Sequence, residues 1–186
     1  EGCKGRQEMN RENFWKEVNE ARARNESRLW KGVFPEASVL DMNVLCDINQ
    51  YLTSTCGTNA FEGSGPMVSP VHGDPRVKPF YTEFINYLTR VGTEINWNSL
   101  FFFSLCDTHN SFPLHGDTET VFLIQGHGDV GMITVNEDGS DKRLHHMQTG
   151  DVLLLPPLYN HKPIPMGPRV TLSLGALPKA HENPGM

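Results

Sequence analysis

Three side chains in the second half of the sequence have the types and spacing of a mononuclear iron site. His115 and Asp117 are two residues apart, and His161 lies 44 positions after Asp117. An Fe(II) oxygenase site needs two imidazoles and one carboxylate on one face of the metal, which leaves the opposite face for substrate and oxygen. Side chains two apart on an extended segment point the same way, so one strand end can supply a nitrogen and an oxygen. We therefore predict His115, Asp117 and His161 as metal ligands and catalytic residues.

The tripeptide HGD is not specific by itself, because it occurs three times in the sequence. Residues 72–74 lie in a stretch rich in Gly and Pro, and residues 127–129 lie in a predicted tight turn between two strands. Residues 115–117 instead lead into an apolar run, and His161 follows another. Precise sites are built on rigid elements, which favours the set with His161. The alternative for any single histidine is an ordinary surface or turn residue.

The first half of the chain shows helical periodicity in two segments. Residues 8–28 carry Phe14, Val18 and Ala21 at helical spacing, and apolar residues recur at three and four residue steps in 77–95. Residues 39–45 are predicted as an early strand. Residues 57–76 are rich in Gly, Ser and Pro and are predicted as a loop.

After residue 95 the pattern changes to short strands separated by turn residues, which is typical of an antiparallel sandwich or barrel. The length suits one domain. Within it we expect a helical and mixed N-terminal elaboration over 1–94, a β core over 95–176 and a C-terminal tail over 177–186. The predicted strands are 99–105, 120–125, 131–135, 143–147, 152–155 and 169–174.

Composition argues against two classes of partner. The formal net charge is −6 and the 16 Lys and Arg residues are scattered, so no basic stripe is present for nucleic acid. No apolar run reaches the ~18 residues of a membrane span, and the first ten residues lack the apolar centre of a signal peptide. We expect a soluble cytoplasmic protein that binds neither nucleic acid nor membrane. The cysteines lack paired spacing and are predicted to be free thiols; they are Cys3, Cys46, Cys56 and Cys106.

Two long segments carry a resemblance to a known family. The stretch SLFFFSLCDTHNSFPLHGDTETVFLIQGHG, followed by GDVLLLPPLYNHKPIPMGPRVTLSLG, resembles the JmjC-type, cupin-like Fe(II) and 2-oxoglutarate-dependent oxygenases. The similarity is greatest to small JmjC hydroxylases, in which an HxD strand runs into a VF-x-x-Q-G segment. It covers residues 95–176, about half of the chain. The resemblance implies a double-stranded β-helix (cupin or jelly-roll) of antiparallel strands, with His115, Asp117 and His161 as the iron ligands and 2-oxoglutarate as cosubstrate.

The sequence departs from the JmjC pattern at the cosubstrate anchor. JmjC enzymes place a Lys or Arg on the strand after the HxD strand, but that position falls near Val130, and residues 121–141 contain neither. Other branches of these oxygenases use a basic residue shortly after the distal His, as R-x-S or R-x-T. Arg169 and Thr171 fit that pattern, eight and ten residues past His161. We predict that both bind 2-oxoglutarate, Arg169 through its guanidinium fork and Thr171 as a hydroxyl donor. The alternative for Arg169 is an exposed charge on a strand.

The resemblance implies an oxygenase that consumes O2 and 2-oxoglutarate. Hydroxylation is favoured over halogenation, because halogenating relatives lack the carboxylate that Asp117 supplies. The expected substrate is a peptide or protein side chain, or a small metabolite. Two alternatives stay open: a metal-dependent cupin that works without 2-oxoglutarate, as a direct dioxygenase or isomerase, and a non-catalytic β-barrel binding module. The sequence does not indicate an oligomeric state.

Overall fold

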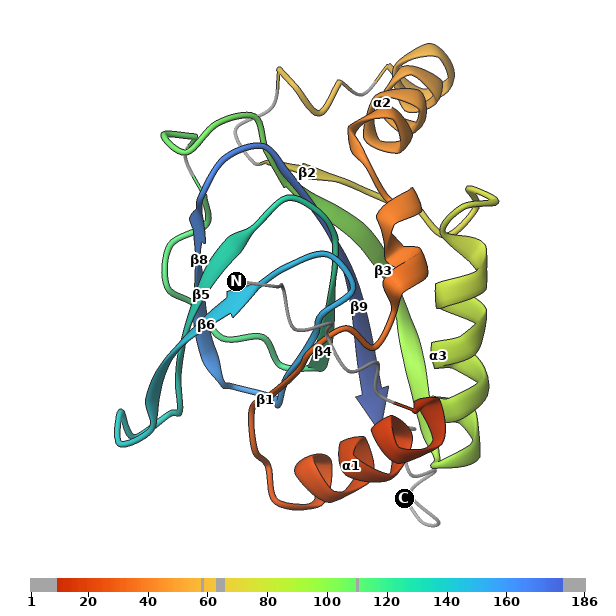
Figure 1. Cartoon of the computed structure of the whole chain (residues 1–186). Helices are drawn as coiled ribbons and strands as arrows, with labels where there is room; N and C mark the ends of the chain where they lie inside the picture. Colours follow the sequence, from red (N-terminus) through yellow and green to blue (C-terminus); the bar gives the residue numbers. More distant parts are fainter. Residues whose placement is uncertain (1–9, 58, 63–65, 110, 179–186) are drawn as a thin grey trace, which may run out of the picture.

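A computed structural model describes residues 10–57, 59–62, 66–109 and 111–178, with only the backbone described for 93–98 and 177–178. Two antiparallel sheets face each other, and helices cover the outer side of the larger one (Figure 1). The larger sheet has the order β1-β7-β4-β9-β3-β2 and the smaller one β6-β5-β8. This architecture confirms the expected double-stranded β-helix with N-terminal helices.

The elements follow one another with short connections. The helices are α1 (Arg11–Ala23), η1 (a 3-10 helix, Pro35–Val39), α2 (Met42–Cys56) and α3 (Lys78–Arg90). The strands are β1 (Arg28–Trp30), β2 (Met67–Val68), β3 (Thr93–Ser104), β4 (Thr120–His127), β5 (Val130–Val135), β6 (Lys142–Met147), β7 (Val152–Leu155), β8 (Asn160–Pro165) and β9 (Arg169–Pro178).

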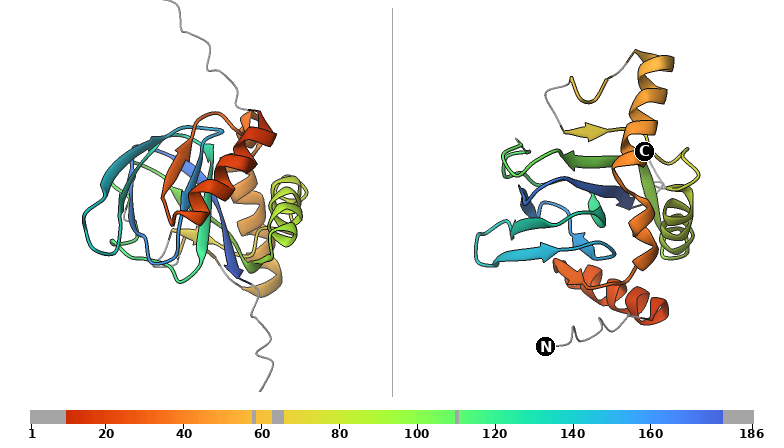
Figure 2. Two further views of the ribbon diagram at one scale, coloured as in Figure 1. Left: turned by 90° about the horizontal axis from the view of Figure 1, so that it is seen from below. Right: turned by 45° about the horizontal axis from the view of Figure 1, so that its top comes forward.

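The larger sheet is buried on both faces, which explains its continuous apolar runs. In β4, Val121 and Leu123 face the smaller sheet and join the core inside the barrel, whereas Phe122 and Ile124 face the helices. Phe84 of α3 packs edge-on against Phe122 with ring centroids 5.0 Å apart. Figure 2 shows the helices gathered against the strands from two further directions. The helical layer thus fixes the strand that leads out of the HxD segment.

The two predicted helices are confirmed, but the strand predicted over 39–45 is wrong. The Asp41 side chain accepts hydrogen bonds from the backbone N–H groups of Asn43 and Val44, at 2.9 and 3.0 Å, and so caps α2. Val44, Leu45 and Ile48 then fall on one buried helical face. A short apolar run has no periodicity of its own, and the cap decided between strand and helix.

The sequence missed β8, the strand that carries His161. Its two prolines, Pro163 and Pro165, argue against a central strand because they lack a backbone N–H. In the structure β8 pairs with β5 on one side and lies at the edge of the three-stranded sheet, where the missing donors are tolerated. The strands β1 and β2, of three and two residues, were also missed and extend the two edges of the larger sheet.

Two other expectations concern membrane-spanning helices and the cysteines. None of the described helices has the length and apolar character needed to cross a membrane. Cys46, Cys56 and Cys106 carry free, exposed thiols, and Cys3 lies outside the described residues.

Candidate metal centre

The two predicted histidine ligands are brought together by a backbone bridge. His115 donates its N–H to the carbonyl of His161 at 3.2 Å, and His161 donates to the carbonyl of His115 at 2.7 Å. Residues paired directly in this way present their side chains on the same face. The ring centroids are 4.4 Å apart. The 46-residue separation of the two histidines in sequence is thus closed by two hydrogen bonds.

Asp117 completes the cluster. Its carboxylate oxygens lie 3.6 Å from Nε2 of His161 and 4.0 Å from Nε2 of His115. Leu158 donates its N–H to the Asp117 carbonyl at 2.6 Å, which ties this segment to the turn before β8. Ligand atoms of the three side chains all lie within 4.8 Å of one another, and no other trio of His, Cys, Asp or Glu in the described residues does so.

The tautomers of the two histidines leave the same nitrogen available on each ring. Nδ1 of His115 lies 2.8 Å from the carbonyl oxygen of Pro113, and Nδ1 of His161 lies 3.3 Å from that of Tyr159. A carbonyl only accepts, so each Nδ1 carries the proton and each Nε2 presents a lone pair toward Asp117. Burial lowers the pKa of His161, and the nearby His115 lowers it further. Metal ligation needs this neutral imidazole form.

The HGD copy at residues 72–74 lies elsewhere and has structural contacts. His72 Nδ1 lies 2.7 Å from Ser99 Oγ, and the ring stacks on Tyr81. Asp74 accepts from Arg76 Nε at 2.9 Å. These contacts join the loop before α3 to β3 and α3, at a distance from the His115 bridge.

The copy at residues 127–129 forms the connection between β4 and β5. His127 is exposed at the end of β4, and Gly128 adopts a φ of 69°. A Cβ atom on Gly128 would collide with the carbonyl of Pro168, so glycine is required there. Asp129 accepts from Nε2 of His146 at 2.9 Å. Neither spare copy joins a metal-binding trio in the described residues.

A small, narrow pocket adjoins the two histidines. Its polar lining comes from the histidines and from Arg169 and Thr171 on β9, and the other walls are apolar. The lining residues are Phe102, Phe112, His115, Leu123, Met132, His161, Pro163, Arg169 and Thr171. The structure therefore places the predicted cosubstrate residues and the predicted histidine ligands around one space.

Arg169 is a buried cation without a counter-charge among the described residues. Its residue surface is only 1% exposed, which excludes the reading of an exposed strand charge. Nη1 donates to Thr171 Oγ1 at 2.9 Å, and Nε has no hydrogen-bond partner in the described part of the chain. Burial lowers the pKa of Arg169 to about 10. Because a buried charge normally has an ionic partner, this one points to an anionic ligand.

Thr171 differs from its predicted role as a donor to the ligand. It donates its proton to Oε1 of Gln125 at 2.7 Å and accepts from Arg169. Gln125 in turn donates Nε2 to the carbonyls of His127 and Gly128 at 2.7 and 3.0 Å. Sequence reasoning missed Gln125, although an amide directly after the apolar run VFLI is a signal that could have found it.

The other candidate positions for a cosubstrate anchor do not supply a buried cation. Val130 is completely buried inside the barrel, at the place where JmjC proteins carry the basic residue. Lys142, Arg143 and Lys162 are exposed, and Arg143 Nε donates to Asp141 at 2.8 Å.

No protein-family model and no curated protein sequence matches this chain. Solved structures do match. The fold is shared with a ribosomal oxygenase. YcfD of Escherichia coli superimposes with a TM-score of 0.62 at 15% identity, over 88% of this chain and 51% of that chain. YcfD in complex with cobalt and 2-oxoglutarate gives a TM-score of 0.51 at 19% identity, over 64% of this chain and 35% of that chain.

The complex of YcfD with cobalt and succinic acid gives a TM-score of 0.51 at 22% identity, over 60% of this chain and 31% of that one. The present chain spans at most about half of the length of the YcfD chains that it matches. Identities this low show a common fold, the double-stranded β-helix. They leave the chemistry of this chain to be argued from its own residues.

Proposed function

We propose that this chain is an Fe(II)- and 2-oxoglutarate-dependent oxygenase with His115, Asp117 and His161 as the iron ligands. One observation carries the proposal: the uncompensated Arg169 lines the same pocket as the two histidines. A metal cluster alone fits many cupin functions, and a buried cation alone fits many anions. Together they favour a cosubstrate that is an anion at one end and a metal chelator at the other.

The donor set suits Fe(II). Two imidazole nitrogens and one carboxylate oxygen are the ligands of non-haem iron oxygenases, and the same set accepts Mn, Co or Ni. His161 is buried, whereas the side chains of His115 and Asp117 are 35% and 36% exposed. The exposed side leaves room for further ligands on the metal. The Nδ1 contacts to backbone carbonyls would hold both rings in the binding tautomer.

The side chains that line the adjoining pocket suit the chemistry of 2-oxoglutarate. Arg169 would bind the distal carboxylate, and the apolar walls would contact the two methylene groups. The 2-oxo acid end would then face the histidines. When bound, iron and 2-oxoglutarate supply the oxidising chemistry: O2 and 2-oxoglutarate are converted to succinate and CO2, and one oxygen atom enters a substrate C–H bond. Arg169 and the apolar walls orient the cosubstrate and exclude water from it.

The substrate is proposed as a peptide or protein side chain, with a small metabolite as the second class. The structural relative is described as a ribosomal oxygenase, which favours a protein substrate by analogy of fold. Leu158 is 48% exposed next to Asp117, so the cluster borders the surface and is accessible from outside. The alternatives are a direct dioxygenase or isomerase and a non-catalytic barrel; neither requires a buried cation beside the metal ligands, as the binding of 2-oxoglutarate does.

Metal analysis of purified variants tests the site. We expect the parent protein to bind one Fe(II), and His115→Ala, Asp117→Ala and His161→Ala each to lose most of it. The matched controls are His72→Ala and His127→Ala, which belong to the other HGD copies and should keep full occupancy. Full metal in all three ligand variants would refute the assigned cluster.

A second experiment separates the oxygenase from its alternatives. Anaerobic titration with Fe(II) and then 2-oxoglutarate should produce the visible charge-transfer band of the iron chelate. With O2 and ascorbate, slow formation of succinate should follow even without substrate. A direct dioxygenase or isomerase would bind metal but give no such band, and a protein without the metal would be a binding module.

A further inference from the structure

A directional chain of hydrogen bonds lies behind the anion pocket. Arg169 donates to Thr171, Thr171 donates to Gln125, and Gln125 donates to two backbone carbonyls of the connection between β4 and β5. Each of these hydrogen bonds runs from Arg169 toward the connection between β4 and β5. Thr171 has given its only proton to Gln125, so its oxygen is available only as an acceptor for Arg169.

We propose that Gln125 is a positioning residue that controls anion binding indirectly, by fixing Thr171 and through it the Arg169 guanidinium. The proposal rests on the proposed function. Gln125 is completely buried and does not line the pocket, so it acts without touching the ligand. Its amide is the one neutral group that both accepts from Thr171 and donates to the carbonyls of His127 and Gly128.

The neutrality of this chain matters as much as its geometry. All acceptors around Arg169 in the described residues are uncharged, so the guanidinium keeps its positive charge available for a ligand. A carboxylate at position 125 would provide a counter-charge within the chain and compete with the anion. A glutamine at position 125 leaves the positive charge of Arg169 to the ligand, whereas a glutamate of the same shape would compensate that charge.

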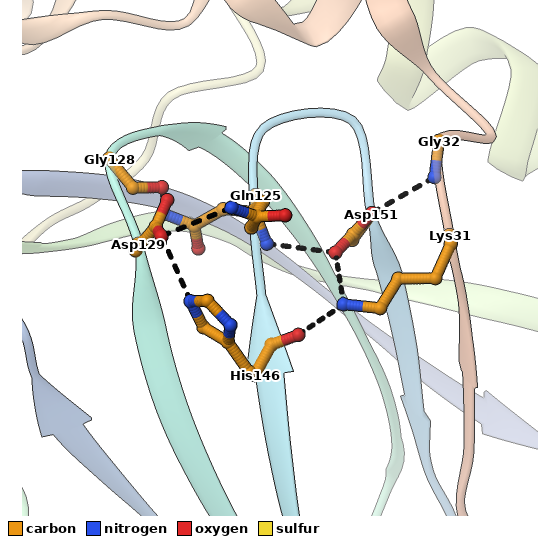
Figure 3. A network of polar contacts seen from close by, with 8 residues as sticks. Lys31, Gly32, Gln125, Gly128, Asp129, His146 and Asp151 are labelled. Atoms are coloured by element: carbon orange, nitrogen blue, oxygen red, sulfur yellow. Dashed lines mark hydrogen bonds and ion pairs between the residues drawn. The ribbon is translucent and has the colours of Figure 1, made fainter. Parts of the chain in front are cut away.

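The partners of Gln125 are themselves held in place. Gly128 and Asp129 belong to a polar network that joins the connection between β4 and β5 to β6 and to the turn before β7 (Figure 3). Asp129 accepts from His146 and from Gln148 Nε2, the latter at 3.2 Å. The close approach of Gly128 to the Pro168 carbonyl joins this connection to the start of β9. Gln125 is therefore anchored on a fixed backbone, as a positioning residue requires.

Calorimetric titration of 2-oxoglutarate into the Mn(II)-loaded protein tests the proposal without turnover. We expect Gln125→Met to raise the dissociation constant about tenfold and Gln125→Glu to raise it further at pH 8, with manganese occupancy unchanged in both. The control is Gln50→Met, which replaces an exposed glutamine of α2 that lies outside this network. It should bind 2-oxoglutarate like the parent.

A double-mutant cycle shows whether Gln125 acts through Arg169. In an Arg169→Ala background, Gln125→Met should cause no further loss of affinity, whereas a general structural defect would weaken binding in both backgrounds. If Gln125→Met does not fold, Thr171→Val breaks the same chain and takes its place in the cycle. Parent-like affinity of the folded variants, or equal losses in both backgrounds, would overturn the inference. A parent protein that does not bind 2-oxoglutarate would overturn the proposed function and this inference with it.

Discussion

Two buried charges in the barrel have opposite surroundings. Asp151 is completely buried and fully partnered: Gly32 N–H reaches Oδ1 at 2.9 Å, and Lys31 Nζ and Gln148 N–H reach Oδ2 at 2.9 and 2.8 Å (Figure 3). Arg169 is equally buried, but its polar contact in the described residues is the neutral Thr171. The same fold therefore holds one buried charge with a full set of partners and another whose described partner is neutral.

We interpret Asp151 as a charge that stabilises the fold and Arg169 as a charge that binds a ligand. The partners of Asp151 come from the segment after β1 and the turn before β7, so this carboxylate joins the ends of two paired strands. Lys31 also donates to the carbonyl of His146 on β6, so the contact reaches the smaller sheet. In the described residues, the Arg169 side chain donates within its own strand, to Thr171. Its lowered pKa corresponds to roughly 3 kcal/mol of disfavoured charge, a cost that a bound anion would offset.

The largest expected effect is the loss of cosubstrate binding in Arg169→Ala. We expect the Michaelis constant for 2-oxoglutarate to rise by a factor that corresponds to about 2 to 5 kcal/mol of lost binding free energy. Iron should remain bound. Arg169→Lys should recover part of the loss, because a point charge cannot reproduce the bidentate fork. Steady-state kinetics with varied 2-oxoglutarate measures both. Unchanged constants in Arg169→Ala would turn the search to Lys142, Arg143 and Lys162, and would withdraw the 2-oxoglutarate assignment if these also had no effect.

The second effect is a loss of stability in Asp151→Asn. The amide cannot replace both oxygens as acceptors, so a buried N–H and the Lys31 ammonium lose their partner. We expect the free energy of unfolding to fall by about 3 kcal/mol, measured by urea denaturation. Metal occupancy should stay at the parent value, because Asp151 contacts none of the three predicted ligands. If Asp151→Asn is as stable as the parent, Asp151 does not stabilise the fold, and the contrast with Arg169 is lost.

The smallest effect has the opposite sign. Arg169→Met keeps the volume of the side chain but removes the uncompensated charge, so the protein without ligand should become more stable by about 1 kcal/mol. The same denaturation experiment measures it. In the presence of 2-oxoglutarate the order should reverse, since only the parent gains stability from binding. A large loss of stability in Arg169→Met would instead indicate a structural role for Arg169.

Much of the fold was predictable because its signals are local. The helical spacing of Phe14, Val18 and Ala21 predicted α1. Turn residues between short strand-like runs predicted most strands of the barrel. The strand predicted over 39–45 failed because the cap at Asp41 outweighed a short apolar run. The strands β1 and β2 come from the predicted N-terminal elaboration and form the two edges of the larger sheet. We propose that both halves form one folding unit.

The sequence by itself determined the residue types of the candidate site and the order in which they occur. His115, Asp117, His161 and Arg169 could be selected because their chemistry and spacing are legible along the chain. Only the tertiary structure decided which HGD copy meets a second histidine, since that depends on the bridge between His115 and β8. It also decided that Arg169 has no counter-charge within the described part of the chain. Burial and pairing are properties of contacts between distant strands, and a linear pattern does not contain them.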